Sequence, residues 1–148
     1  EISLGLVGSE MCIRDRALPV LTEREAGAYS PNVLAFYGDC VYELLVRREV
    51  VLRGNTNAGR LHDLAVEQVR ASYQSRAVDV IEPMLTEKES DILRRGRNAG
   101  GISVPKSAKP SEYRRATALE ALFGYLSLSG QQERIEELFT AICEALPV

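Results

Sequence analysis

Two stretches of the sequence are helical in period and almost wholly apolar, and each contains a single carboxylate. Between Pro31 and Tyr42 the only charged residue is Asp39, and between Ala116 and Ser129 the only one is Glu120. Helices this apolar are expected to be buried on most of their faces. A carboxylate in such a helix costs several kcal/mol unless it is paired, protonated or bound to a metal. Any fold of this chain must therefore accommodate these two acids.

Neither stretch contains a basic partner for its acid. One solution is that Asp39 and Glu120 share a divalent cation, since carboxylates suit Mg²⁺, which keeps several waters and needs only one or two of them. The other is that each acid pairs with an arginine from elsewhere, such as Arg47 or Arg114. Periodicity alone favours neither solution.

Two glycines, Gly38 and Gly124, lie close to the acids in the sequence. A glycine inside a helix costs about 1 kcal/mol relative to alanine, so it usually indicates that another backbone or a ligand comes close. Close packing of one helix on another would also explain both.

The rest of the sequence predicts helices too, and no segment alternates as a strand does. Capping-box patterns begin at Thr22 and Thr86, and Ser30-Pro31 places an N-cap before a proline at the first helical position. A chain of 148 residues suits one domain. We expect an all-α fold, a single compact helical domain over residues 20–148. Its helices should cover residues 22–29, 31–48, 61–81, 86–97 and 111–129, followed by a last helix that ends near residue 146.

Positive charge is concentrated in one segment of an acidic chain. From Arg94 to Arg115 there are seven basic residues and one acid, a net charge of +6, although the whole chain carries −3. Residues 98–110 of this segment are rich in glycine, serine and proline, and loops this long in a small domain are usually functional or disordered. A local basic stripe is typical of a surface that binds a polyanion. The alternative is an arginine-rich helix end that is simply solvated.

Other features limit the class of protein. Residues 1–19 lack the pattern of a signal peptide and break any helical period, so we expect foreign or disordered sequence there. Three cysteines without paired spacing favour a reducing compartment, and the cytoplasm is the expected location. The single histidine, His62, excludes a site built from several histidines. No apolar run approaches the roughly 20 residues of a membrane helix, so no membrane partner is expected.

Several motifs resemble the ribonuclease III superfamily. The segment LAFYGDCVYELLVR resembles its signature helix, in which Gly38-Asp39 and Glu43-Leu44 match the family motif. Residues 116–124 resemble the second metal-binding helix, with Glu120 at the position of the catalytic glutamate. The short chain, RRGRNA at residues 94–99 and EYRRATALEALFGYL at residues 112–126 resemble the Mini-III branch, a catalytic domain without a double-stranded-RNA-binding domain. The resemblance extends from about Leu21 to Leu146.

The resemblance implies a homodimeric, Mg²⁺-dependent endoribonuclease, with Mn²⁺ as a substitute metal. It would cut double-stranded RNA to leave 5′-phosphates, and its branch implies maturation of precursor 23S ribosomal RNA. Asn32, Ala35 and Thr117 stand where the larger family enzymes have further acids. Only Asp39 and Glu120 therefore carry over as catalytic metal ligands, with Glu43 and Thr117 expected beside them rather than on the metal.

The basic segment supplies the expected RNA contacts, and residues 99–110 should lie over the duplex. A ribosomal protein that presents the RNA is a possible further partner, and the role of His62 stays open between a phosphate contact and a surface or capping position. The alternative function is a non-catalytic RNA-binding or ribosome-associated protein on the same fold; a helical interaction module is a third reading. The expected RNA-binding residues are Arg94, Arg95, Arg97, Asn98, Lys106, Arg114 and Arg115.

Overall fold

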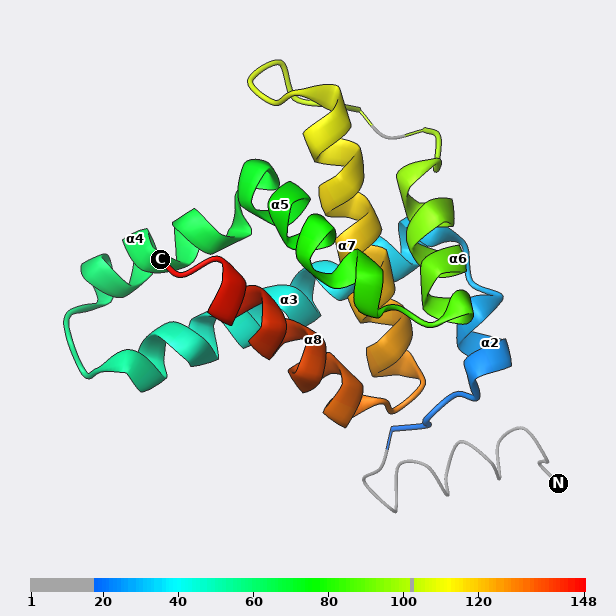
Figure 1. Ribbon diagram of the computed structural model, residues 1–148, viewed down its shortest axis with the longest axis horizontal. Coiled ribbons are helices and arrows are strands. Elements are labelled where there is room, and N and C mark those ends of the chain that lie inside the picture. The colour runs from blue at the N-terminus through cyan, green and yellow to red at the C-terminus, as the bar shows by residue number, and fades with distance from the viewer. Residues whose placement is uncertain (1–17, 102) are drawn as a thin grey trace, which may run out of the picture.

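The computed structural model describes residues 18–101 and 103–148, and within them it contains helices and no strand (Figure 1). The predicted all-α fold is confirmed. The foreign segment predicted at residues 1–19 lies outside the described residues except for Leu18 and Pro19, which are exposed and not helical. The helices are α2 (Glu23–Gly27), α3 (Pro31–Arg53), α4 (Ala58–Val69), α5 (Ala71–Ile81), a 3-10 turn (Glu82–Met84), α6 (Glu87–Arg97), α7 (Pro110–Leu128) and α8 (Gln132–Ala145).

Helix α7 is the centre of the fold. In Figure 1, α3 passes behind it and α5 in front, α6 stands beside it, and α8 packs below α5. Ten residues of α7 between Ala116 and Leu126 are buried, so the predicted burial of this apolar stretch is confirmed. Burial of each large apolar side chain contributes about 1.5–3 kcal/mol, which makes α7 the main source of core stability.

Helix α3 differs from this expectation. One face, with Leu34, Tyr42 and Val46 among its residues, is buried against α7 and the helices around it. The opposite face is not covered by any other part of residues 18–101 and 103–148, and Phe36 there is 82% exposed. The prediction that the stretch from Pro31 to Tyr42 is buried on most faces is therefore wrong for the single chain. The exposed residues of this surface, here called the open α3 face, are Val33, Phe36, Tyr37, Cys40 and Leu44.

The helix expected over residues 61–81 is in fact two helices. Arg70 takes an extended conformation, with φ −63° and ψ 146°, and separates α4 from α5. The side-chain amide of Gln74 donates to the carbonyl of Val69 at 3.0 Å, which satisfies a carbonyl at the end of α4. This corner allows α4 to pack on α3 while α5 turns onto α7.

Helix ends mostly follow the predicted caps. Both capping boxes form, at Thr22 with Glu25 and at Thr86 with Glu89, and the Ser30 hydroxyl accepts a hydrogen bond from the Val33 amide. Two ends differ. Helix α3 continues five residues beyond Arg48, because Val50 is buried and Arg53 is held by Glu49 and by the carbonyl of Val148. Helix α7 begins at Pro110 with Lys109 at the N-cap, one residue before the predicted start at residue 111.

The described helices fall short of what crossing a lipid bilayer requires. None of those within residues 18–101 and 103–148 combines the length and the apolar character that a membrane crossing needs.

Candidate active site

Helices α3 and α7 cross in backbone contact at two glycines. A Cβ atom added at Gly38 would overlap the carbonyl oxygen of Glu120 and would lie 2.8 Å from the amide nitrogen of Gly124. A Cβ added at Gly124 would overlap the carbonyl oxygen of Leu34. The close approach predicted from these glycines is confirmed, and the neighbour is backbone. Because Asp39 follows Gly38 and Glu120 lies one turn before Gly124, the crossing brings both acids to one place.

The two carboxyl groups lie close enough for the charge of one to affect the other. The pKa of Glu120 is raised to about 8, first by burial and then by the charge of Asp39. Asp39 is exposed, whereas Glu120 is half-buried. The pair is therefore open to solvent on the side of Asp39, and at neutral pH without a cation Glu120 retains a proton.

Arginines do not neutralise this pair. Over residues 18–101 and 103–148, no ion pair within 4.0 Å includes Asp39 or Glu120. Arg47, one arginine considered from the sequence, instead pairs with Glu43 at 2.7 Å. The sequence left open whether the two acids share a cation or pair with arginines. In the described structure they do not pair with arginines.

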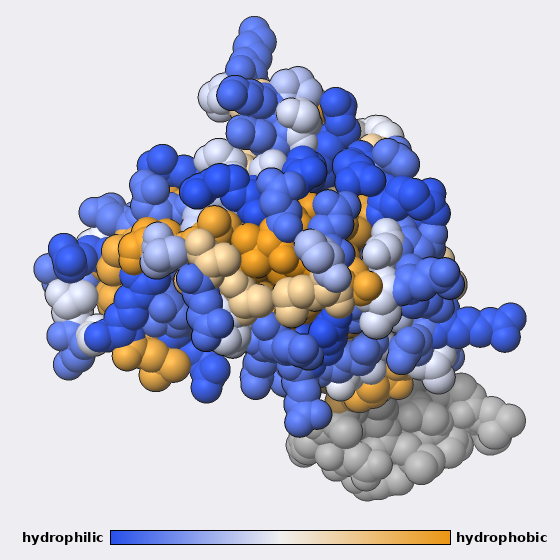
Figure 2. Space-filling view, in the orientation of Figure 1, coloured by the Kyte–Doolittle hydropathy of each residue, from blue (hydrophilic) through white to orange (hydrophobic). Residues whose placement is uncertain are grey.

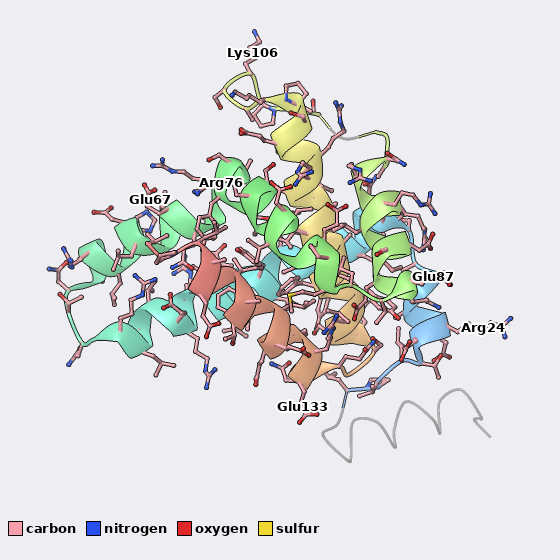
Figure 3. All side chains as sticks on the ribbon, viewed as in Figure 1. Arg24, Glu67, Arg76, Glu87, Lys106 and Glu133 are labelled. Carbon is pink, nitrogen blue, oxygen red and sulfur yellow. The ribbon has the colours of Figure 1, made fainter. Side chains whose placement is uncertain are left out.

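The basic segment lies at the end of the molecule formed by the C-terminus of α6, the loop after it and the N-terminus of α7. This end is mainly hydrophilic in the face shown in Figure 2. A hollow of about 510 Å³ there is lined by Arg97, Asn98, Arg114 and Arg115, together with Ala99 and Ser111. Lys106 points outward from the loop, away from the body of the protein (Figure 3). Ile102, in the same loop, lies outside the described residues.

Four of the expected RNA-binding arginines have partners within the described chain. Arg97 pairs with Glu82 at 3.8 Å, and Arg115 bonds to Ser75 and Asp79. The guanidinium of Arg95 donates to the carbonyls of Gly27 at 2.8 Å and Tyr29 at 3.2 Å, so it ties α6 to the end of α2. Arg94 is exposed and pairs with Asp91 on its own helix. The hollow therefore gathers only four of the seven predicted residues.

Comparison with known proteins identifies the family. A model described as Ribonuclease III domain matches residues 32–131. The Mini-ribonuclease 3 of Symbiobacterium thermophilum is 45% identical over 114 residues, which cover 77% of this chain and 88% of that protein. The Mini-ribonuclease 3 of a Thermoanaerobacter species is 42% identical over 119 residues, covering 80% and 84%. The chain belongs to the ribonuclease III family.

A solved structure agrees with this membership. A crystal structure of a Fusobacterium nucleatum protein superposes with a TM-score of 0.73 at 32% identity, and the match covers 80% of this chain and 94% of that one. The relatives place the chain in the Mini-ribonuclease 3 branch of the ribonuclease III family, and its activity is that of an endoribonuclease.

The donor set of this ribonuclease III site suits a hydrated divalent cation. Two adjacent carboxylates without a basic partner supply hard oxygen ligands. Beside them, the side-chain oxygen of Gln74 is buried without a hydrogen-bond partner. No group of three or more His, Cys, Asp or Glu side chains that could hold a metal exists in the described part of the chain. Water would therefore complete most of a cation's coordination.

The two residues expected beside the ligands make other contacts. The carboxylate of Glu43 is bonded to Arg47, one turn further along α3. Thr117 is buried, and its hydroxyl donates to the carbonyl of Tyr113 at 3.0 Å. Neither side chain bonds to Asp39 or Glu120, so any help they give to the metal ligands is indirect.

Two buried polar side chains near the acids were missed from the sequence. Gln74 on α5 is buried, and its amide opposes the rise in the pKa of Glu120. The hydroxyl of Tyr42 is buried without a partner, and burial raises its pKa. Gln74 had no usable signal, because its place depends on the corner at Arg70, which periodicity does not detect. Tyr42 had none, because its ring fits the core pattern.

Proposed function

We propose that this endoribonuclease uses Mg²⁺, for which Mn²⁺ can substitute, bound by Asp39 and Glu120 to hydrolyse phosphodiesters in double-stranded RNA. The observation that carries the proposal is the pair of facing carboxylates, which no arginine of the described chain neutralises. Asp39 and Glu120 would hold the cation, and Glu120 would then carry no proton.

The chemistry follows from the positions of the two acids. A bound divalent cation would polarise the scissile phosphate and a water molecule. Asp39 is exposed, so that water and an RNA phosphate would reach it from solvent. Glu120, anchored at the helix crossing, keeps a fixed position relative to Asp39 and would hold the metal in its deprotonated form. Addition of water across the P–O3′ bond leaves a 5′-phosphate and a 3′-hydroxyl.

The basic hollow supports a double-stranded substrate. A-form RNA is bound mainly through its phosphates and 2′-hydroxyls rather than through base edges. Arg114 lies six residues before Glu120 on α7. Six residues span about 9 Å along a helix. A strand held by its phosphates in the hollow can therefore extend toward the acids. Lys106 and the loop that carries it would contact the same duplex.

The open α3 face supports a homodimer. It contains five exposed apolar residues on one helix, and Phe36 and Leu44 are 82% and 68% exposed. Contiguous exposed apolar surface is typical of a contact between proteins. Two chains joined through this face would have an Asp39 near each side of the contact, so that one dimer could cut both strands.

We further propose precursor 23S ribosomal RNA in the cytoplasm as the substrate, presented by a ribosomal protein. This part rests on the resemblance to the Mini-III branch and on the small size of the basic hollow, which alone gives limited selectivity. The non-catalytic alternative has no support from the site, since both acids are retained and lie side by side.

The test is cleavage of a labelled RNA duplex by wild type and Asp39→Asn, with Mg²⁺ and with EDTA. We expect cleavage by wild type in Mg²⁺ only, and loss of at least about a thousandfold in rate for Asp39→Asn, because amide oxygen does not replace a charged ligand. Glu133→Gln on α8, an exposed acid away from the site (Figure 3), is the matched control and should cut normally. Cleavage by Asp39→Asn at the wild-type rate would contradict the metal assignment.

A further inference from the structure

The loop between α6 and α7 is joined by a hydrogen bond to the start of α3. The side-chain amide of Asn32 donates to the carbonyl of Gly100 at 3.0 Å, across 68 residues of sequence. Because a carbonyl only accepts, the amide must present its nitrogen there. In the described part of the chain, the other hydrogen bonds of residues 98–109 stay within this segment or join it to the adjoining ends of α6 and α7. The bond from Asn32 is therefore the one that ties the loop to a different helix.

A second tie lies on the other side of the same junction. The guanidinium of Arg95, in the last turn of α6, donates to the carbonyls of Gly27 and Tyr29, in the chain just before α3. The end of α6 is thus held by the residues before α3, and the loop that follows α6 is held by α3 itself. Together the two ties fix the point at which the basic segment leaves α6.

Asn32 lies on the helix that also carries Asp39. The two residues are seven positions apart, which is nearly two full turns, so their side chains leave α3 on the same side and about 10 Å apart along its axis. Both are exposed. One rigid helix therefore holds the start of the basic loop at one end and an acid of the site two turns further on.

The start of the loop has little other support. Gly101 has φ 79°, a conformation that L side chains rarely adopt. Residues 99–101 form one wall of a cavity of about 140 Å³, and the opposite wall includes Tyr113, Arg114 and Thr117 of α7. Arg114 also lines the basic hollow. The loop thus begins above a space between itself and α7, so its bond to α3 matters for where it lies.

We propose that Asn32 is a positioning residue for RNA binding: its amide holds the start of the basic loop in place before the duplex arrives. This inference rests on the proposed function, in which the loop contacts the duplex. A loop that is already in place loses less conformational freedom on binding, so the affinity for the duplex is higher. An amide suits this position because it donates without charge. An ionised acid here could not donate to the carbonyl and would repel the phosphates.

The first test is digestion of the full chain by trypsin, in EDTA and without RNA. Trypsin cuts after Lys106, which is exposed and points away from the body of the protein (Figure 3). For Asn32→Ala and Asn32→Asp we expect this cut to be about 3- to 10-fold faster than in wild type, the usual net effect of losing one hydrogen bond. Asn55→Ala is the control, because Asn55 is exposed in the turn between α3 and α4. Its rate of cutting should stay within about twofold of wild type.

Asn32→Asp keeps the shape of the side chain and removes its donor. An acid in the first turn of a helix is favourable, so the melting temperature of this variant should not fall. Faster cutting at Lys106 in Asn32→Asp cannot then be attributed to general unfolding. Unchanged cutting in both Asn32 variants would show that the bond does not hold the loop, and would overturn the inference.

The second test is steady-state cleavage of an RNA duplex in Mg²⁺. For Asn32→Ala we expect KM to rise by about 3- to 10-fold and kcat to stay within about twofold, since Asp39 and Glu120 are unchanged. A change in stability alone would not move KM. A raised KM with unchanged trypsin cutting would mean that Asn32 touches the RNA directly, and an unchanged KM with faster cutting would mean that the tie does not serve binding. Either result contradicts the proposed role.

The two assays also separate this inference from the proposed function. If wild type cuts the duplex and both Asn32 variants match it in both assays, the proposed function stands and the role of Asn32 is wrong. If wild type neither binds nor cuts the duplex, the proposed function fails. The role of Asn32 in RNA binding then fails with it, even where trypsin shows that the loop is tied to α3.

Discussion

The proton on Glu120 links stability, pH and metal binding at the level of a single residue. Burial and the neighbouring Asp39 raise the pKa of Glu120 from 4.5 to about 8 in the folded chain. Between these two values the folded chain keeps a proton that the unfolded chain releases. Because the native state then binds more protons, the contribution of Glu120 to stability falls as pH rises from about 4.5 to about 8, and is constant above that.

Glu120→Gln should remove this pH dependence. The neutral amide cannot repel Asp39, so the metal-free variant should melt higher than metal-free wild type at pH 8, and the difference should shrink toward pH 5. Thermal melts in EDTA across this range measure it. Adding Mg²⁺ should raise the melting temperature of wild type more at pH 8 than at pH 6, because the cation competes with the proton for the pair. Parallel curves for wild type and variant would contradict the raised pKa.

Arg95 and Arg114 belong to the same basic segment, and the structure gives them different tasks. Arg95 is half-buried and donates to two backbone carbonyls, so Arg95→Ala should lower the free energy of unfolding by about 1–3 kcal/mol. Arg114 is exposed in the hollow, so Arg114→Ala should leave stability nearly unchanged and weaken RNA binding. Denaturant unfolding and duplex binding at several salt concentrations distinguish the two. The salt slope should become shallower by about one unit for Arg114→Ala only.

At the scale of helices, the crossing of α3 and α7 determines where the acids meet. Gly38→Ala should destabilise the protein by about 3 kcal/mol, since its Cβ meets backbone that cannot rotate away. This loss would exceed the gain of up to about 1 kcal/mol that alanine gives inside a helix. Denaturant unfolding measures the change, and cleavage should fall as the helices separate. Gly100→Ala is the control, because nothing lies within 4 Å of its added Cβ; an equal loss there would show that the crossing is not the cause.

Features that depend on neighbouring residues were predictable from the sequence. The capping boxes at Thr22 and Thr86 formed as expected, because a cap is completed within four residues of its own helix. Gly38 and Gly124 also indicated a close approach from the local sequence alone. A glycine inside an apolar helix has no side chain, which leaves room for a neighbouring backbone or a ligand. The sequence could not say which backbone fills that place, since this depends on the crossing of two distant helices.

Features that depend on how the helices are arranged in space could not be predicted from the sequence. The apolar period continues through Arg70 because α4 and α5 both turn apolar residues inward, so periodicity cannot detect the corner between them. The same limit hid the place of Gln74, because that corner turns α5 onto α7. Apolar composition likewise could not distinguish α7, which is buried within the chain, from α3, whose second face is left uncovered.

The whole molecule presents three surfaces of different character. A basic hollow lies at the N-terminal end of α7, the acid pair lies at the middle of that helix, and the open α3 face lies on the side of α3 away from it. Helix α3 carries both Asp39 and the apolar face, so any chain that covers this face also comes close to the acid pair. Assembly and catalysis are therefore expected to be coupled through one helix.

Phe36→Glu should disrupt the homodimer. Phe36 is 82% exposed on the open α3 face, and a charge buried there in a contact between two chains would be unpaired in both copies. We expect the dimer dissociation constant to rise by at least about a hundredfold, in keeping with the loss of a central aromatic contact. Light scattering over a range of concentrations, in EDTA to exclude effects of metal, measures it. Leu18→Glu is the control, because Leu18 is equally apolar and 88% exposed but lies outside α3. A wild type that stays monomeric at high concentration, or a Phe36→Glu variant as dimeric as wild type, would mean that this face binds something other than a second copy of the chain.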